Sequence, residues 1–244
     1  MISSLGQLGI FFLQTCLSIV SPPWYLKQFL KQLVNVGYLS LPVIGLTAIF
    51  SGMVLALQSY TGFSRFNAEN AIATVVVLSM TRELGPVLAG LMVAGRVGAA
   101  MAAELGTMRV TEQIDALTTL STPPMRYLVA PRVLAALVSL PFLVLIADII
   151  GVMGGYIVGT YQLGFNAGNY MNQTLSFLEA RDVISGLIKA AVFGFVIALM
   201  GCYHGYTSKG GAAGVGQATT NAVVSASILI LLFNYALTTL LFDR

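Results

Sequence analysis

Four ionisable side chains interrupt apolar runs that are long enough to cross a membrane. Arg82 and Glu83 are adjacent, Asp148 lies deep in a later run, and Lys189 lies near the start of another. Each charge at membrane depth costs about 2.5–3.5 kcal/mol on insertion scales, so such groups line a functional cavity or neutralise one another inside the bundle. We favour a polar cavity for Arg82, Glu83 and Lys189, and neutralisation within the bundle for Asp148.

A proline follows the charged pair, at Pro86. On one helix Arg82 and Glu83 point about 100° apart, so they need not pair with each other. Because proline has no backbone N–H, a helix through Pro86 leaves a carbonyl about one turn earlier without its usual donor. The sequence therefore predicts a kink, with free backbone acceptors beside the charged pair.

The residues needed for catalysis or metal binding are not gathered in the sequence. The single histidine, His204, has neither a second ligand nearby nor the partners of a nucleophilic triad. Residues 211–219 have the glycine spacing of a phosphate-binding loop, but Gln217 stands where the essential lysine belongs. Cys16 and Cys202 lie far apart in apolar surroundings, as buried inert thiols do. We therefore predict no catalytic residues, no metal site and no ATPase in this chain.

The composition is typical of a membrane-embedded protein. Of the 244 residues 57% are apolar and 9% are charged, against about 25% charged residues in soluble domains, and the mean hydropathy is +0.87. No block of Lys or Arg indicates nucleic acid as a partner. We predict an all-α polytopic membrane protein with a single transmembrane domain, 1–244. The predicted spans are 36–57, 71–103, 128–159, 183–203 and 218–242.

Residues 1–34 precede the first predicted span. The apolar run at 9–20 is shorter than the roughly 20 residues that a spanning helix needs, and it lacks the basic start and cleavage site of a signal peptide. Pro-Pro-Trp-Tyr at 22–25 then interrupts it. We predict an interfacial helix with the Trp and Tyr at headgroup depth. A short, poorly inserted first span is the alternative.

A short amphiphilic segment, Glu104 to Asp115, follows the second predicted span. It carries further charges at Arg109 and Glu112, and apolar residues that include Ile114. We predict a surface helix across one end of the bundle, with its charges available to a partner. A plain connecting helix is the alternative that the composition leaves open.

Basic residues are distributed unevenly between the two sets of loops. One set contains Lys27, Lys31, Arg109, Arg126, Arg132 and Lys209, and the other contains Arg65, Arg181 and Arg244. Cytoplasmic loops of membrane proteins carry the excess of Lys and Arg. The distribution therefore predicts a cytoplasmic N-terminus and a C-terminus on the opposite side.

Three motifs occur together in this chain. They are ELGPVLAGLMVAGRVGAAMAAELGTMRVTEQIDAL at 83–117, PR-x-x-A-x-x-x-S-L-P at 131–141, and GGYIVG at 154–159. With these motifs the chain resembles the MlaE family, the permease subunits of ABC-type phospholipid transporters in Gram-negative inner membranes, which have relatives in plastids and mycobacteria. The resemblance covers nearly the whole chain from about residue 35, and the first motif is long enough to be highly specific.

The resemblance implies an assembly in the bacterial inner membrane. Each subunit of a homodimer would have an N-terminal interfacial helix, five transmembrane helices and a cytoplasmic coupling helix between the second and third spans. A separate ATPase subunit (MlaF-like) would bind ATP and Mg, so this chain needs no cofactor. A STAS-domain subunit (MlaB-like) and a hexameric periplasmic MCE protein (MlaD-like) would complete a machine that moves phospholipid and maintains outer-membrane lipid asymmetry.

The resemblance also implies roles for individual residues, carried over by position. The implied lipid-binding residues are Leu55, Phe66, Arg82, Glu83, Leu84 and Lys189. The implied ATPase-coupling residues are Glu104, Arg109, Glu112, Ile114 and Asp115.

Two other functional classes remain as alternatives at this stage. An ion-coupled secondary transporter would use Glu83 and Lys189, but it should show inverted repeats, and the sequence shows none. A structural anchor for a periplasmic complex would not need a charged cytoplasmic helix. Co-purification of an ATPase subunit would distinguish an ABC permease from both.

Overall fold

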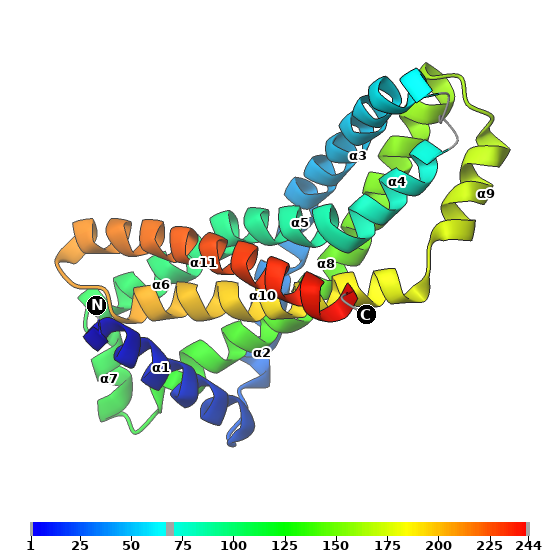
Figure 1. The fold of residues 1–244 in the computed structure, drawn as a ribbon. Helices are drawn as coiled ribbons and strands as arrows, with labels where there is room; N and C mark the ends of the chain where they lie inside the picture. Colours follow the sequence, from blue (N-terminus) through cyan, green and yellow to red (C-terminus); the bar gives the residue numbers. More distant parts are fainter. Residues whose placement is uncertain (1, 67–70, 243–244) are drawn as a thin grey trace.

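The computed structural model describes residues 2–66 and 71–242, and helices are the only regular secondary structure in this part of the chain (Figure 1). The prediction of an all-α polytopic membrane protein is confirmed. A short apolar helix, α1 (Ile2–Val20), comes first. Five segments of the described residues are then long and apolar enough to cross a membrane: Leu26–Phe63, Ile72–Val110, Met125–Gln162, Ala180–Tyr206 and Gly211–Phe242.

Three of the spans consist of several helical pieces. The first comprises α2 (Leu26–Val36), η1 (Tyr38–Ser40) and α3 (Leu41–Phe63), with η2 (Ser64–Phe66) after it. The second comprises α4 (Ile72–Ser79), η4 (Met80–Leu84), α5 (Gly85–Val93), η5 (Ala94–Gly98) and α6 (Ala99–Val110). The third comprises η6 (Met125–Val129), α8 (Ala130–Ile157) and η7 (Val158–Gln162). The remaining helices are α7 (Gln113–Thr119), α9 (Ala167–Phe177), α10 (Ala180–Tyr206) and α11 (Gly211–Phe242).

The first three spans are longer than the predicted ones. They contain 38 or 39 residues each. That is about 57 Å at 1.5 Å per residue, whereas a bilayer core is about 30 Å thick. These helices therefore continue beyond the membrane or cross it at a steep tilt, and hydropathy alone located only their apolar middle parts.

Short π-helical segments interrupt the second span, and two more begin and end the third span. One of them, η4, ends directly before Gly85 and Pro86. The second span bends between α4 and α5, as the proline predicted (Figure 1). A π-turn is wider than an α-turn and often lies at a functional site. This π-turn contains both Arg82 and Glu83.

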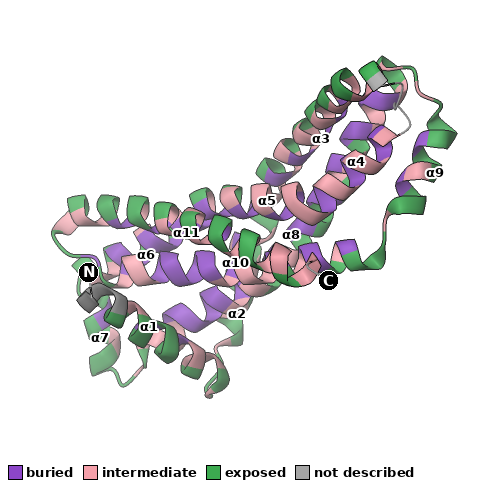
Figure 2. Cartoon of the chain, viewed as in Figure 1, coloured by how far each residue is buried: buried purple, intermediate pink, exposed green. Residues whose placement is uncertain are grey.

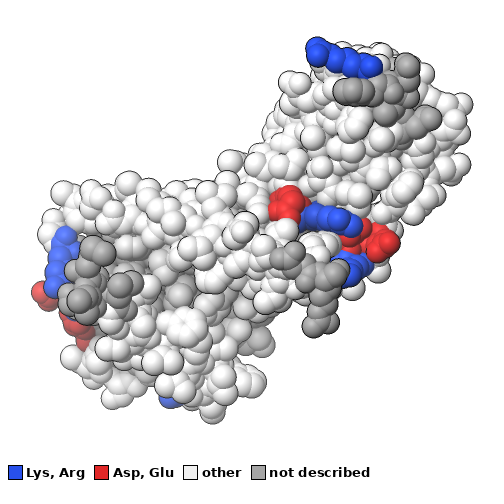
Figure 3. Space-filling view, viewed as in Figure 1, with Lys and Arg blue, Asp and Glu red and all other residues white. Residues whose placement is uncertain are grey.

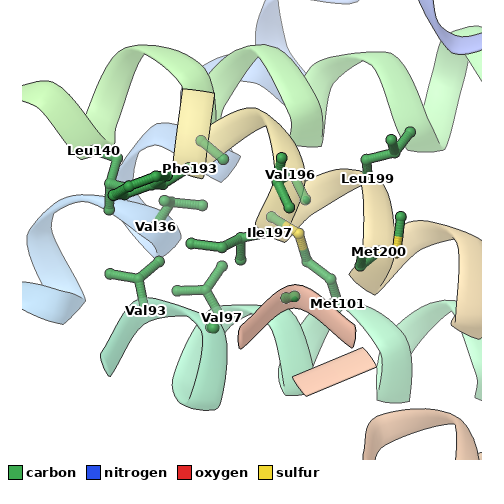
Figure 4. Close-up of a cluster of buried hydrophobic side chains, with 14 of the residues drawn as sticks. Val36, Val93, Val97, Met101, Leu140, Phe193, Val196, Ile197, Leu199 and Met200 are labelled. Carbon is green, nitrogen blue, oxygen red and sulfur yellow. The ribbon is translucent and has the colours of Figure 1, made fainter. Parts of the chain in front are cut away.

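The helices form a body and an arm (Figure 1). The body contains α1, α2, α6, α7, α10 and α11, and the arm contains α3, α4, α9 and the end of α8. In the body, buried residues gather on α6, α8 and α10, and further buried residues lie along the arm (Figure 2). The side chains in the body form a continuous hydrophobic cluster that includes Val97, Met101, Leu140, Phe193 and Ile197 (Figure 4). Among the five spans α10 is the most buried and α11 the most exposed.

The arm has a smaller hydrophobic cluster of its own, which includes Ile72, Val76 and Met80. Its helices α3 and α8 pack backbone against backbone, because a Cβ added at Gly52 would overlap the carbonyl of Gly151. Small residues allow such close approaches between membrane helices. The arm therefore depends on glycine at this crossing.

The segment predicted as a single surface helix, Glu104 to Asp115, is divided in the structure. Its first part continues the second span to Val110, and the surface helix α7 begins only at Gln113. Glu112 separates the two with a left-handed backbone, φ 58°. That conformation is uncommon for a residue other than glycine, and a hydropathy pattern does not reveal it.

Two segments between predicted spans are partly helical. Residues 204–217 lie between the predicted spans 183–203 and 218–242, but α10 continues to Tyr206 and α11 begins at Gly211. A Cβ added at Gly106 on α6 would touch Val215, so tertiary packing supports this early turn of α11. The polar stretch 160–182 contains α9, whose N-cap Asn166 accepts a hydrogen bond from the backbone N–H of Asn169.

Candidate functional site

Three helices bring six polar and charged side chains together, and we call this group the polar belt. It consists of Arg82 and Glu83 on η4, Asp182 and Lys189 on α10, and Asn234 and Thr238 on α11. Figure 3 shows charged side chains gathered where the body meets the arm. The structure thus joins three of the predicted lipid-binding residues, Arg82, Glu83 and Lys189, in one site.

Lys189 is the buried centre of the polar belt. Its side chain is fully buried, and its Nζ lies 2.7 Å from Glu83 Oε1, 2.8 Å from the Arg82 carbonyl and 2.8 Å from Thr238 Oγ1. An ammonium group has three hydrogens to donate, so all three have acceptors here. Lys189 therefore holds three helices together, and no donor of its ammonium group remains for a ligand in this conformation.

The proline and the π-turn explain how Lys189 reaches a backbone carbonyl. Pro86 has no N–H to offer the carbonyl of Arg82 four residues earlier, and Lys189 Nζ donates to that oxygen instead. The helices also lie very close together, because a Cβ added at Gly186 would overlap the carbonyl of Thr81. Gly186 is one turn before Lys189, on the same face of α10. The predicted free acceptor is therefore present, and a lysine occupies it.

Glu83 receives hydrogen bonds from two further residues that the sequence analysis missed. Thr238 Oγ1 lies 3.0 Å from Glu83 Oε1, and Asn234 Nδ2 lies 2.8 Å from Oε2. Asn234 and Thr238 are four residues apart and so share one face of α11. Two polar residues at this spacing in an apolar span were the available signal.

Arg82 differs from Lys189 because part of it remains free. Its Nε and Nη2 both lie 2.7 Å from Oδ1 of Asp182, and its guanidinium lies 4.7 Å from the centre of the Phe242 ring. The Arg82 side chain is 37% exposed, whereas that of Asp182 is 1% exposed. Among the described residues Nη1 has no hydrogen-bond partner. Arg82 thus offers two N–H donors at the surface of the polar belt.

Asp182 is held rigidly at the start of α10. Its Oδ2 accepts from the backbone N–H of Glu179 at 3.2 Å, and the Glu179 side chain in turn caps the helix. This capping box fixes Oδ2, while Arg82 binds Oδ1. Asp182 falls between the predicted spans 128–159 and 183–203, so its role as the partner of Arg82 was not predicted.

The other predicted lipid-binding residues lie differently. Leu84 follows Glu83 on η4, and it packs with Leu55 of α3 against the hydrophobic cluster of the arm. Both are half-buried. Leu84 directly follows Glu83 in the chain, so it places an apolar side chain next to the belt. The Phe66 side chain lies outside the described residues.

Asp148 contradicts the expectation that another charge would neutralise it. None of the ion pairs between described residues includes it, and its buried Oδ1 has no hydrogen-bond partner among them. This oxygen lies against Gly85, where an added Cβ would overlap it. The sequence showed the depth of Asp148 but not that it faces the backbone of α5.

The predicted coupling residues surround α7 at the far end of the body. Arg109 Nη1 pairs with Asp115 Oδ1 at 2.7 Å, and Glu112 is exposed at the turn between α6 and α7. Ile114 is 1% exposed and joins the main hydrophobic cluster. Glu104 pairs with the largely buried Arg132 at 2.9 Å. Arg109, Glu112 and Asp115 are therefore accessible to a partner, whereas Ile114 fastens α7 to the body.

The site has the properties of a binding surface. No group of three or more His, Cys, Asp or Glu residues in the described part of the chain could hold a metal ion. The four charged members of the polar belt carry two positive and two negative charges, so its formal charges cancel. What remains is an apolar surface beside a guanidinium with free donors.

Comparison with known proteins identifies the relatives of this chain. The family model described as Permease MlaE matches residues 29–240. A "Probable ABC transporter permease protein" of Rickettsia bellii is 63% identical over 239 residues, which cover 98% of this chain and 92% of that protein. The "Intermembrane phospholipid transport system permease protein MlaE" of Haemophilus influenzae is 36% identical over 231 residues, covering 92% and 88%. The chloroplastic "Protein TRIGALACTOSYLDIACYLGLYCEROL 1" of Arabidopsis thaliana is 38% identical over 230 residues, covering 94% and 66%.

Proposed function

Because the chain belongs to the MlaE permease family of ABC transporters, we propose that it carries phospholipid between the inner membrane and a periplasmic MCE-domain partner, and so maintains outer-membrane lipid asymmetry. The chain is a multi-pass membrane permease subunit without ATPase activity of its own. ATP hydrolysis belongs to a separate subunit. Because the family consists of ABC transporter permeases, we no longer favour the alternative of an ion-coupled secondary transporter.

The observation that carries the lipid proposal is the free side of Arg82. Two N–H donors of Nη1 remain after Asp182 has been satisfied, and guanidinium donors suit the oxygens of a phosphate. The belt is otherwise neutral, which favours a zwitterionic or singly charged headgroup over a multiply charged one. Leu84 and Leu55 supply apolar surface on the arm side for acyl chains.

Glu83 and Lys189 take a supporting role in this proposal. Lys189 fixes the π-turn through the Arg82 carbonyl, and Glu83 fixes α11 through Asn234 and Thr238. The side chain of Arg82 is thereby presented from a rigid backbone. A rigid first contact is what selective binding of a headgroup needs, because less conformational entropy is lost on binding.

The same proposal assigns α7 to the ATPase subunit. The accessible charges on and beside α7, Arg109, Glu112 and Asp115, lie at the basic end of the body that the positive-inside rule places in the cytoplasm. One helical segment, Ile72–Val110, joins this end to the polar belt. A homodimer with ATPase, STAS-domain and MCE-domain subunits completes the proposed assembly.

The test uses the purified complex in vesicles, with transfer of labelled phospholipid to acceptor vesicles followed with and without ATP. Arg82→Lys keeps a positive charge beside Asp182 and removes the free Nη1 donors. We expect ATP-dependent transfer to fall about tenfold, the effect of losing one charge-assisted hydrogen bond of about 1.5 kcal/mol. The thermal midpoint should change little.

Arg65→Lys is the matched control, because Arg65 is exposed on η2 at the end of the arm and should tolerate the change. Full transfer by Arg82→Lys would refute the headgroup assignment. Transfer that does not respond to ATP in the unmodified complex would refute the proposed function itself.

A further inference from the structure

A second amphipathic site lies at the α7 end of the molecule, away from the polar belt. A cavity of about 340 Å³ opens between α1, α2 and the start of α8. Apolar and aromatic residues such as Trp24, Phe29, Leu134 and Val138 form most of its lining, and Arg126 is the charged residue among them. We call this cavity the α1–α8 groove.

The α1–α8 groove has the length of one membrane leaflet. Arg126, Ala130, Leu134 and Val138 follow one another at four-residue intervals and therefore lie along one face of the third span. Twelve residues at 1.5 Å each give about 18 Å. Half of a bilayer core is about 15 Å. An acyl chain whose headgroup lies at Arg126 would end close to Val138.

The charge at the mouth of the groove has no acidic partner. Arg126 Nη1 donates to the Pro22 carbonyl at 2.6 Å, and none of the ion pairs between described residues includes Arg126. One hydrogen bond to a neutral carbonyl leaves most guanidinium donors available. Trp24 beside it is 75% exposed, as expected for an aromatic residue at the headgroup level.

The walls of the groove are fixed before any ligand binds. Tyr25 and Tyr127 meet edge to face with their ring centres 4.9 Å apart. Gln28 Nε2 donates to the Tyr127 hydroxyl at 2.7 Å. These contacts join the turn after α1, helix α2 and η6. The Arg126 bond to Pro22 closes the same corner.

We propose that the α1–α8 groove binds an anionic phospholipid of the adjacent leaflet, with its phosphate at Arg126 and one acyl chain along the stripe to Val138. The positive-inside rule makes this the cytoplasmic leaflet, where basic pockets between membrane helices bind anionic headgroups. The lipid fastens α1 to α2 and α8. Binding at this groove is independent of which substrate the polar belt carries.

Trp24 allows a direct test because it is the only tryptophan of the chain. The purified full-length chain in phosphatidylcholine-containing micelles is titrated with phosphatidylglycerol, phosphatidylcholine or palmitate, each brominated on the acyl chain, and quenching of Trp24 fluorescence is measured. We expect phosphatidylglycerol to reach half-quenching at about one fifth of the phosphatidylcholine concentration, which is the contribution of one basic residue near an anionic headgroup. The half-quenching concentration of palmitate should not be lower than that of phosphatidylcholine.

Five variants separate the effect of charge from the effect of shape. Arg126→Gln should abolish the preference for phosphatidylglycerol and Arg126→Lys should keep it, while Lys31→Gln, exposed on α2 outside the groove, should not change it. Val138→Phe fills the far end of the groove and should weaken quenching by both phospholipids. Ile149→Phe, on an exposed face of the same helix, is its control.

Three results would overturn the proposal. Equal quenching of the unmodified chain by both phospholipids would mean that only unselective annular lipid is present. Palmitate quenching as effectively as phosphatidylglycerol would assign the groove to free fatty acid. A photoreactive residue at position 138 that cross-links to a partner polypeptide in the assembled complex, and not to lipid, would assign the groove to a partner helix.

Discussion

Replacing Lys189 by methionine tests whether this residue holds the polar belt together. Lys189→Met keeps most of the side-chain volume and removes the ammonium group that serves Glu83, the Arg82 carbonyl and Thr238. Breaking a fully buried ion pair from one side costs about 3–5 kcal/mol. The Glu83 side chain is 37% exposed, so screening of the remaining carboxylate reduces the expected cost here to about 2–3 kcal/mol. For a domain of this size about 1 kcal/mol corresponds to a shift of roughly 2–4 °C in the thermal midpoint. We therefore expect a decrease of about 4–12 °C.

The double variant distinguishes the charge from the packing. Glu83→Gln in the Lys189→Met background removes the stranded carboxylate and keeps an oxygen that can accept from Thr238. Neutral pairs of similar volume often replace buried ion pairs at little cost. The double variant should therefore recover more than half of the lost thermal midpoint.

The assay is thermal unfolding of the purified chain in one detergent, followed by loss of the monodisperse peak in size-exclusion chromatography. Lys31→Met, on the exposed side of α2, is the control and should shift the midpoint by about 1–2 °C at most. A double variant no more stable than Lys189→Met would show that loss of the lysine does not leave Glu83 as an unpaired, destabilising charge. A single variant as stable as the control would refute the central role of Lys189.

Two further predictions concern the ends of the molecule. Glu112→Lys reverses an exposed charge beside α7. We expect ATP turnover of the complex to lose its dependence on lipid, while the thermal midpoint stays within about 2 °C. Unchanged stimulation of ATP turnover by lipid would refute the assignment of α7 to the ATPase. Tyr170→Phe on α9 removes a buried hydroxyl without a partner among the described residues. Burial raises the pKa of Tyr170 to about 12, so the folded state loses stability as pH rises from the ordinary value of 10 towards 12. Tyr170→Phe should raise the thermal midpoint by about 2–4 °C at pH 8, corresponding to about 1 kcal/mol. It should also reduce the loss of stability between pH 10 and pH 12. A lower midpoint at pH 8 would show that the hydroxyl has a partner.

The sequence predicted the helical membrane fold because apolar runs report directly on the lipid environment. Their ends could not be predicted in the same way. The second span continues through Glu104 and Arg109 into Val110, since a helix does not stop where its residues become polar. The bend at Pro86 was predictable from a local rule, because proline acts on its own turn.

Only some members of the polar belt were predictable from the sequence. A charge in an apolar run is visible in the sequence, so Arg82, Glu83 and Lys189 were found. Their partners depend on how helices far apart in the sequence are rotated against each other, and no local pattern encodes that rotation. Asp182 looked like a loop residue, and Asn234 and Thr238 carry no charge that would have marked them.

The polar belt divides the two requirements of a lipid carrier between its two ion pairs. The Lys189–Glu83 pair is closed, because every ammonium hydrogen has an acceptor and both carboxylate oxygens have donors. Such a pair sets the position of three helices and gains nothing from a ligand. The Arg82–Asp182 pair is open, because Asp182 is buried and fixed while part of Arg82 remains exposed with free donors. A phosphate can bind there without separating either pair, so no buried charge is left without its partner when lipid binds. Binding and release of lipid are thereby separated from the contacts that hold the fold.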